Sequence, residues 1–291
     1  MLAEDFSSHP YRLWDSDPDG LGKSLAPSAE ADHVRAQVEY VFVVYDCIQK
    51  CVSPEILSPG FTKELFLQAW LCLLTRKFSC PHGSSFVPGV DFFNHLASPS
   101  ASSDWDDSQE AVVVRARRPH AAGEEISICY GELSNPLLWR TYGFTLPPSE
   151  EPTWTCTFKE SDLVELCYEG GPAGLDCAER FAELPNVHLD ARLVTETLAV
   201  ALETCAAAGG NAVRLLRELC RARTSLLQND PCLAPALAAL GQQRDGDRDD
   251  LSAVGGATDE AAIRVKMSEY LCLAAHLEAL DVALGDGPEE S

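Results

Sequence analysis

Apolar and polar positions divide the chain into a helical beginning, a strand-rich middle and a helical end. Residues 32–51 place apolar side chains on one helical face. Residues 63–78 are apolar nearly all round, so we expect a buried helix, with Thr62 in the position of its cap. Residues 1–30 are polar and contain Pro and Gly, which predicts irregular structure.

Short runs rich in β-branched and aromatic residues follow, with turn-forming residues between them. The runs 84–93, 111–118 and 124–131 predict strands. The polar stretch 96–110 predicts a surface loop.

A short helix is predicted after these runs. Asn135 stands at its cap, Pro136 at its first position and Gly143 just beyond its end. These three residue types are the ones preferred at those positions, so both ends of the helix are marked in the sequence.

The pattern becomes helical after residue 150, although residues 153–158 could form one strand. We place a domain boundary near 145–150, between a mixed α+β part and an all-α part, so the predicted fold class is α+β. Helices are expected over 190–208, 211–228 and 259–284, with a charged loop over 243–258.

The formal net charge of −23 over 291 residues narrows the range of partners. Nucleic acid requires basic surface, so we expect no nucleic-acid binding. A Lys/Arg-rich protein segment would be attracted to such a chain. The sequence does not indicate an oligomeric state.

The sequence also bears on the compartment. No apolar run is long enough to span a bilayer, and residues 1–20 show no signal-peptide pattern, so we expect no membrane association. The twelve cysteines form no C-x-x-C pair, and several lie in apolar runs, which is typical of reduced thiols. We therefore expect an intracellular protein, cytoplasmic or nuclear, with an organellar location as the alternative.

Three short stretches carry candidate chemistry. Arg76 lies at the end of the apolar helix, Asp91, Asn94 and His95 follow a Pro-Gly turn, and Tyr130 ends a strand-like run. Taken singly, each has an ordinary structural explanation, namely a helix-end cation, a turn with a satisfied histidine, and a packed tyrosine.

A metal-dependent hydrolase is an alternative interpretation, with His82, Asp91, His95 and His120 as ligands. The segment around Asp91 has the pattern of strand and turn rather than helix. A spacing of four residues therefore does not place Asp91 and His95 on one face, and we expect no metal site.

Four motifs in order resemble the SET-domain protein methyltransferases of the Rubisco-methyltransferase type, a group that includes the actin-histidine methyltransferase. Three of the family patterns are S-R-x-F, P-x-x-D-x-x-N-H and A-G-E-E-I-x-I-x-Y-G, and the fourth is a Ser-Asn helix that ends in Y-G-F. Thr75 stands where the family has Ser. Each motif is weak alone, but four in this order are specific. The matching segments are 75–78, 88–95, 122–131 and 134–144.

The resemblance, which covers about residues 35–285, implies transfer of a methyl group from S-adenosylmethionine to a lysine of a protein, or in second place to a histidine. The amine must be neutral when it reacts. A lysine with a pKa of about 10.4 is neutral at pH 7 only about once in 10³, which is equivalent to roughly 4–5 kcal/mol. A neighbouring sulfonium cation and an apolar channel both lower that pKa, so the site should be aromatic.

The resemblance also implies a role for each candidate residue. Arg76 would bind the cofactor's carboxylate, while Asn94 and His95 would hold its adenine and amino-acid ends, partly through backbone atoms. Tyr130 would be the catalytic residue and would orient the methyl group and the amine. Phe144 would contact the cofactor.

The substrate channel would be lined by Tyr142 and, with less support, by Asp91, whose default role is to bond backbone near the turn. Tyr130 and Tyr142 are each followed by a glycine, and we expect them to face one channel from opposite sides of a turn.

The first SET segment of the family, with its G-x-G, has no clear match in the chain. Gly20-Leu21-Gly22 follows a turn rather than a strand, so we expect that segment to be absent. The expected organisation is a partial SET domain over 1–146, with a helical insertion over 1–79 and strands over 80–146, and a helical substrate-binding domain over 147–291. The alternative function is a non-catalytic protein-binding module derived from such an enzyme.

Overall fold

The computed structural model describes residues 5–53, 55–57, 60–159, 186–200, 212–242 and 257–285. These residues divide into two compact units. The first unit is Met1–Asp17, Val34–Leu133 and Leu137–Phe144, and the second is Pro18–His33, Ser134–Pro136 and Thr145–Ser291. The predicted boundary near 145–150 stays a prediction.

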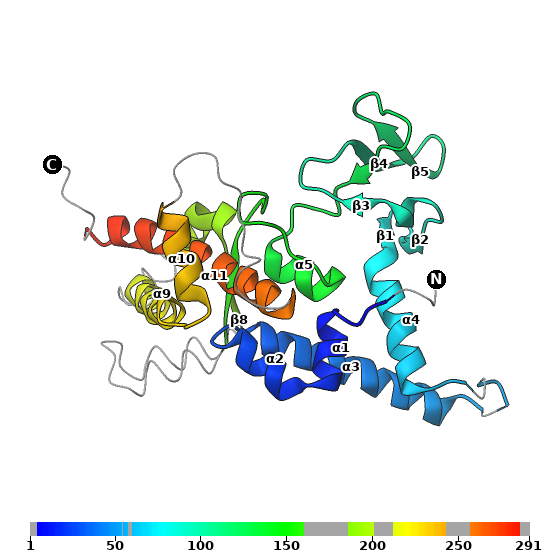
Figure 1. Cartoon of the computed structure of the whole chain (residues 1–291), viewed down its shortest axis with the longest axis horizontal. Helices are drawn as coiled ribbons and strands as arrows, with labels where there is room; N and C mark the ends of the chain where they lie inside the picture. Colours follow the sequence, from blue (N-terminus) through cyan, green and yellow to red (C-terminus); the bar gives the residue numbers. More distant parts are fainter. Residues whose placement is uncertain are drawn as a thin grey trace. The chain divides into compact units, whose positions relative to one another are not determined.

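Helices begin the first unit (Figure 1). α3 (Glu30–Cys51) forms where the one-sided apolar pattern predicts it, and it buries Val34, Val38 and Val41. α4 (Lys63–Arg76) begins at Thr62, whose side chain accepts a hydrogen bond from Leu65 N–H.

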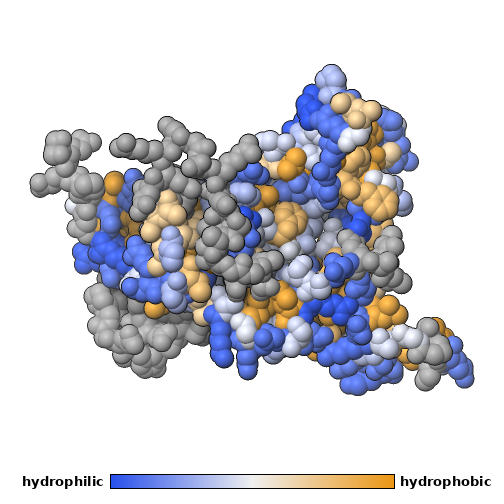
Figure 2. Space-filling view, viewed as in Figure 1, coloured by the Kyte–Doolittle hydropathy of each residue, from blue (hydrophilic) through white to orange (hydrophobic). Residues whose placement is uncertain are grey.

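The expectation that α4 is buried all round is wrong. Leu67, Leu71 and Cys72 are buried, but Leu65 and Leu73 are 40% and 48% exposed. The helix is therefore covered on one face, and its further apolar residues lie at the surface. Figure 2 shows apolar side chains exposed over the strand-rich region of the chain as well.

The expectation of irregular structure over residues 1–30 is also wrong. α1 (Pro10–Ser16) and α2 (Pro18–Leu25) form there, and α2 packs on α11 within the second unit. His9 caps α1, because its Nδ1 accepts from Tyr11 N–H, and its Nε2–H donates to the Thr141 carbonyl at 3.3 Å. Burial lowers the pKa of His9 to about 4, so the ring is neutral near pH 7.

Strand pairs form the rest of the first unit. β1 (Lys77–Cys80) pairs antiparallel with β2 (Gly83–Phe86), and β4 (Ala101–Asp106) pairs antiparallel with β5 (Ala111–Ala116). The strand predicted at 111–118 is confirmed by β5. The surface loop predicted at 96–110 is wrong, since β4 lies within it.

The run at 84–93 is a strand only over its first residues. It continues as a 3-10 turn, η1 (Val90–Phe92). Gly89 precedes this turn with φ +93°, a left-handed conformation that glycine adopts without strain.

A two-residue parallel pairing connects distant parts of the first unit. β3 (Asn94–His95) pairs with β6 (Ser127–Ile128), with Asn94 opposite Ser127 and His95 opposite Ile128. β6 is all that forms of the strand predicted over 124–131.

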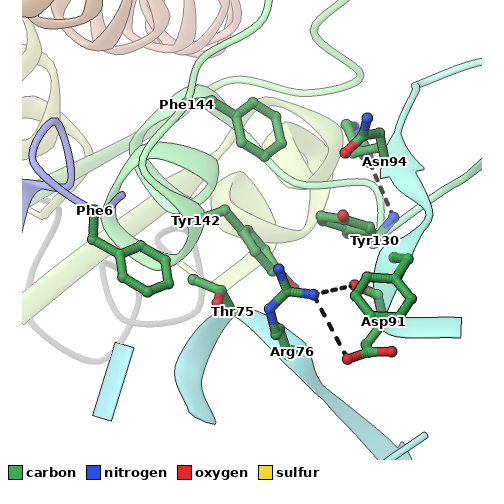
Figure 3. A pocket seen from close by; sticks show the side chains of 10 residues that line it. Phe6, Thr75, Arg76, Asp91, Asn94, Tyr130, Tyr142 and Phe144 are labelled. Atoms are coloured by element: carbon green, nitrogen blue, oxygen red, sulfur yellow. Dashed lines mark hydrogen bonds and ion pairs between the residues drawn. The ribbon is translucent and has the colours of Figure 1, made fainter. Parts of the chain in front are cut away.

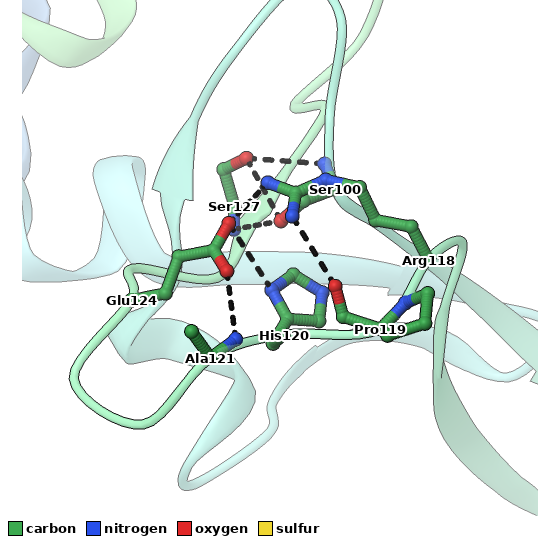
Figure 4. Close-up of polar contacts among 7 residues, drawn as sticks. All are labelled: Ser100, Arg118, Pro119, His120, Ala121, Glu124 and Ser127. Carbon is green, nitrogen blue, oxygen red and sulfur yellow. Dashed lines mark hydrogen bonds and ion pairs between the residues drawn. The ribbon is translucent and has the colours of Figure 1, made fainter.

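Side chains hold β6 and the turn before it in place (Figure 4). Ser100 and Ser127 exchange hydrogen bonds, because each hydroxyl accepts from the other's backbone N–H at 3.0 and 3.2 Å. Glu124 forms an ion pair with Arg118 and accepts from Ala121 N–H at 2.9 Å. The turn that leads into β6 is therefore closed by its own side chains.

α5 (Asn135–Tyr142) confirms the short helix predicted at this position. Asn135 is its first residue, but its side chain bonds elsewhere: Oδ1 accepts from Leu146 N–H at 2.6 Å, and Nδ2 donates to the Leu146 carbonyl at 2.9 Å. Gly143 follows with φ +83°, and its N–H donates to the Trp139 carbonyl and completes the last turn.

The second unit is mainly helical, as its pattern predicts. α9 (Ala212–Gln228), α10 (Leu233–Gln242) and α11 (Ala257–Ala283) surround one core with β7 (Thr155–Lys159) and β8 (Asn186–Asp190). β7 confirms the strand at 153–158, whereas β8 was not predicted. Residues 201–208 of the helix expected at 190–208, and most of the loop expected at 243–258, lie outside the described residues.

Two of the four acidic side chains buried in the described part of the second unit, Glu151 and Glu269, have raised pKa values. Glu151 accepts hydrogen bonds from Asn135 and Ser268, and Glu269 accepts from the Ser28 hydroxyl at 2.6 Å. Burial raises the pKa of both carboxyl groups to about 7. Both carboxyl groups are therefore partly protonated near pH 7.

The contact between Gly143 and His9 yields a first testable prediction. A Cβ added at Gly143 would lie 3.1 Å from Cδ2 of His9, whereas one added at Gly123, with nearly the same φ of +85°, would meet nothing within 4 Å. The left-handed backbone alone costs about 1–2 kcal/mol. Gly143→Ala should therefore lower the free energy of unfolding by about 1 kcal/mol more than Gly123→Ala in urea titrations. Equal losses would show that His9 does not pack there.

The buried Glu269 yields a second prediction. Its folded pKa of about 7 exceeds the ordinary 4.5, so the folded chain holds a proton that the unfolded chain releases. Stability from this group is complete below pH 4.5 and is lost as pH rises through 7. Between pH 5 and pH 8 the unsubstituted chain should lose unfolding free energy. In Glu269→Gln this loss should be smaller by up to roughly 3 kcal/mol.

Urea unfolding at the two pH values, followed by circular dichroism, measures this effect. Glu278→Gln is the control, because Glu278 is exposed on the same helix. A pH dependence in Glu269→Gln equal to that of the unsubstituted chain would contradict the assignment.

Candidate active site

A cavity of about 350 Å³ in the first unit collects the residues of three of the four motifs and of the Y-G-F end of the fourth (Figure 3). Every predicted site residue lies in its wall. The lining residues are Phe6, Thr75, Arg76, Asp91, Phe92, Asn94, His95, Tyr130, Tyr142 and Phe144.

Several of these side chains reach the cavity from the end of an element or from just beyond one, whereas Asp91 lies within a short turn. Arg76 is the last residue of α4, Asp91 lies in η1, and His95 ends the β3 pairing. Tyr130 lies two residues beyond β6, and Tyr142 is the last residue of α5. Residues at element ends can point into a shared space while the elements themselves pack elsewhere.

Four aromatic rings form a cluster at this cavity. The ring centroids of Tyr130 and Tyr142 are 4.8 Å apart, and those of His95 and Tyr130 are 5.3 Å apart. Phe144 lies 5.7 Å from His95 and 6.1 Å from Tyr142. Burial, with a smaller effect of the nearby Cys129, raises the pKa of Tyr142, so its phenol remains protonated at neutral pH. The expectation that the two tyrosines face one space agrees with this geometry.

Tyr130 is held at both ends by one extended segment. Its hydroxyl donates to the Phe93 carbonyl at 2.7 Å, and its backbone N–H donates to Nδ1 of His95 at 3.0 Å. The hydroxyl hydrogen is thereby directed at Phe93, so the phenol oxygen would act as an acceptor toward a ligand.

His95 must be neutral to accept this hydrogen bond. Burial lowers its pKa, and an accepting Nδ1 places the remaining ring hydrogen on Nε2. The Nε2 atom is buried and has no hydrogen-bond partner among the described residues.

Arg76 is bound to Asp91 in two ways (Figure 3). Its Nη1 donates to the Asp91 carbonyl at 2.6 Å and lies 3.6 Å from the carboxylate, whose other oxygen accepts from Gly89 N–H. Asp91 thus bonds the backbone of its turn. The Phe92 ring covers the guanidinium at 5.7 Å and is itself 76% exposed.

The Asn94 side chain is exposed, and its Nδ2 donates to Glu125 at 2.6 Å. Its backbone lies in the pairing with β6. The sequence-based role of Asn94 at a cofactor is therefore compatible with backbone contact, and it stays a prediction.

A second cavity of about 270 Å³ shares a wall with the first. Thr75, Arg76, Asp91, Tyr130 and Tyr142 line both cavities. Those five residues, the tyrosine pair among them, therefore form the boundary that the two cavities share.

The sequence did not identify Phe6, Phe92 or Cys129 as site residues. Phe6 is 8% exposed and reaches the first cavity from a segment expected to be irregular. Cys129 lines the second cavity beside Tyr130. Phe92 and Cys129 each lie inside one of the motif segments, and that position is the signal by which the sequence could have indicated them.

The alternative metal site finds no support in the described part of the chain. No three His, Cys, Asp or Glu side chains among the described residues lie close enough together to hold a metal ion. None of the described helices combines the length and apolar character needed to cross a bilayer.

Comparisons with known proteins identify the class. The SET domain family model matches residues 16–131. The chain is 29% identical over 158 residues to the ribosomal lysine N-methyltransferase set11 of Schizosaccharomyces pombe, covering 50% of this chain and 37% of set11. It is 25% identical over 160 residues to the N-lysine methyltransferase SETD6 of Bos taurus, covering 51% of this chain and 35% of SETD6.

Solved structures agree on the fold. The SET domain of LSMT bound to MeLysine and AdoHcy superposes with a TM-score of 0.53 at 16% identity, covering 91% of this chain and 66% of that one. Rubisco LSMT bound to AdoMet superposes with a TM-score of 0.50 at 17% identity, covering 91% and 66%.

Residues 16–131 therefore match a SET domain. More particularly, the fold of the chain is that of Rubisco LSMT, with a helical region after the SET residues, so the resemblance inferred from the four motifs and the α+β fold class are confirmed. The chain spans little more than a third of the length of the curated relatives named above.

The Arg76–Asp91 pair yields a third prediction. The two side chains are 17% and 4% exposed. Asp91→Asn keeps an acceptor for Gly89 N–H but removes the charge, so the unfolding free energy should fall by about 1–3 kcal/mol. Arg115→Gln breaks the more exposed Arg115–Asp106 pair and should cost less than about 1 kcal/mol. Urea titration compares the two, and equal small losses would mean that solvent screens both pairs.

Proposed function

We propose that this protein transfers a methyl group from S-adenosylmethionine to a lysine side chain of a protein substrate. The observation that carries the proposal is the cluster of His95, Tyr130, Tyr142 and Phe144 around one cavity, with Tyr130 tethered at both ends. The names of set11 and SETD6, and the lysine and cofactor ligands of the LSMT structures, support the same class of reaction.

The residues present fit the cofactor chemically. A sulfonium is a cation, and aromatic ring faces attract cations when water is excluded. The Arg76 guanidinium could pair with the cofactor's carboxylate, provided that it shares its donors with Asp91. The backbone of Asn94 and His95, together with Phe144, would complete the site. When bound, the cofactor supplies an electrophilic methyl group.

The remaining requirement is a neutral amine held in line with that methyl group. The Tyr130 oxygen, whose hydrogen is directed at Phe93, would accept a hydrogen bond from the amine and orient its lone pair. The aromatic walls would disfavour the ammonium form by desolvation. We assign the cofactor to the first cavity and the lysine to the second, so that they meet at Tyr130 and Tyr142.

The proposed substrate is a protein with a basic segment around the target lysine. The net charge of −23 would attract such a segment. The helical second unit would hold the substrate. A histidine target and a non-catalytic binding role are the alternatives that the experiments below separate.

Two measurements test the proposal. Calorimetry with S-adenosylmethionine should give a saturable heat with 1:1 stoichiometry, and labelled cofactor should transfer its methyl group to a protein in a cell lysate, with methyl-lysine in the digested product. Methyl-histidine would change the target residue. Absence of both heat and transfer would favour the binding module.

Tyr130→Phe is the fourth prediction. The variant loses the hydroxyl that orients the amine, so methyl transfer should fall by at least about 10²-fold while the Kd for S-adenosylmethionine changes little. Tyr45→Phe is the matched control, because the Tyr45 hydroxyl also donates to a backbone carbonyl, that of Phe61, away from both cavities. Unchanged turnover in Tyr130→Phe would overturn the assigned role.

A further inference from the structure

We propose that the imidazole of His95 is a positioning residue that holds Tyr130 in its reactive place. This inference rests on the proposed function and concerns the side chain of His95, whereas the sequence assigned this residue to the cofactor. The argument begins with the two acceptors that the segment 93–95 offers to Tyr130.

The two acceptors are two residues apart and bind opposite ends of one residue. The Phe93 carbonyl takes the Tyr130 hydroxyl at 2.7 Å, and Nδ1 of His95 takes the Tyr130 N–H at 3.0 Å. These two hydrogen bonds hold both the backbone and the hydroxyl of Tyr130 against residues 93–95. A tyrosine bonded only through its hydroxyl could still turn about its backbone.

The regular sheet does not supply the acceptor for Tyr130 N–H. The pairing of β3 with β6 ends at His95 and Ile128, and the Ile128 carbonyl accepts from Leu96 N–H at 3.0 Å. Tyr130 lies beyond the pairing, so its amide depends on a side chain. The His95 imidazole therefore extends the pairing by one bond, at the residue where the chemistry would occur.

The His95 ring could instead serve only as packing, since it lies 5.3 Å from the Tyr130 ring and 5.7 Å from Phe144. Two substitutions separate these roles. His95→Asn retains an acceptor near the Nδ1 position but removes the ring. His95→Phe retains an aromatic ring but removes the Nδ1 acceptor of Tyr130 N–H.

If His95 positions Tyr130 through Nδ1, the variant that keeps an acceptor should be more active than the variant that keeps an aromatic ring. In His95→Phe, kcat for methyl transfer should fall by about 10²-fold, as expected for a displacement of about 1 Å, while KM for the protein substrate changes little. In His95→Asn the loss should be less than about 10-fold. The opposite order, with the phenylalanine variant more active than the asparagine variant, would overturn the proposal.

A second readout does not require activity. With ¹⁵N-labelled tyrosine, the Tyr130 amide should exchange with deuterium at similar rates in the unsubstituted chain and in His95→Asn, and at least about 10-fold faster in His95→Phe. Equal exchange in His95→Phe would overturn the proposal. If the unsubstituted chain transfers no methyl group, the proposed function fails, but this amide measurement still decides whether His95 holds Tyr130.

Discussion

The candidate site depends on one short parallel pairing. Asn94 and His95 pair in parallel with Ser127 and Ile128, and this pairing brings Tyr130, two residues beyond β6, within reach of β3 and of the residue before it. Tyr130 consequently meets acceptors that lie 35 and 37 residues earlier in the sequence. Two residues of sheet would be weak alone. The exchanged Ser100–Ser127 hydrogen bonds and the closed turn before β6 hold the second strand in register.

That the residues of the site line one cavity could be predicted because they stand at fixed distances within motifs, but their contacts could not be predicted. Arg76 was expected to offer its guanidinium to a ligand, and the structure pairs it with Asp91, a residue of another motif. His95 was expected to act on a cofactor, and its ring binds the Tyr130 backbone. Motif spacing identifies which residues converge, whereas the hydrogen bonds between them depend on side-chain directions that only the folded chain defines.

The sequence did not predict β4 or the burial of the residues before α1, because the hydrophobic pattern of those segments does not indicate either. β4 contains four polar residues in six, and its side chains are mostly half-buried with no two-residue alternation of burial. Phe6 and His9 precede a seven-residue helix, too short to show a periodicity, yet both are buried. The tight approach of His9 to Gly143 joins residues 134 positions apart. The local hydrophobic pattern shows which face of a segment is apolar. It does not show which distant segment packs against that face.

The strong negative charge of the chain would favour a charged lysine, whereas the proposed reaction requires a neutral one. Carboxylates near a lysine favour its ammonium form and would raise its pKa, which opposes methyl transfer. The charge, however, acts through solvent over roughly 8–10 Å, and it would serve to bring a basic segment to the surface. Within the shared wall of the two cavities, the carboxylate of Asp91 is already balanced by Arg76, and the rings of Tyr142 and the nearby His95 pack against Tyr130. Attraction at long range and desolvation at short range can therefore operate on the same lysine, because they apply to successive steps of its approach.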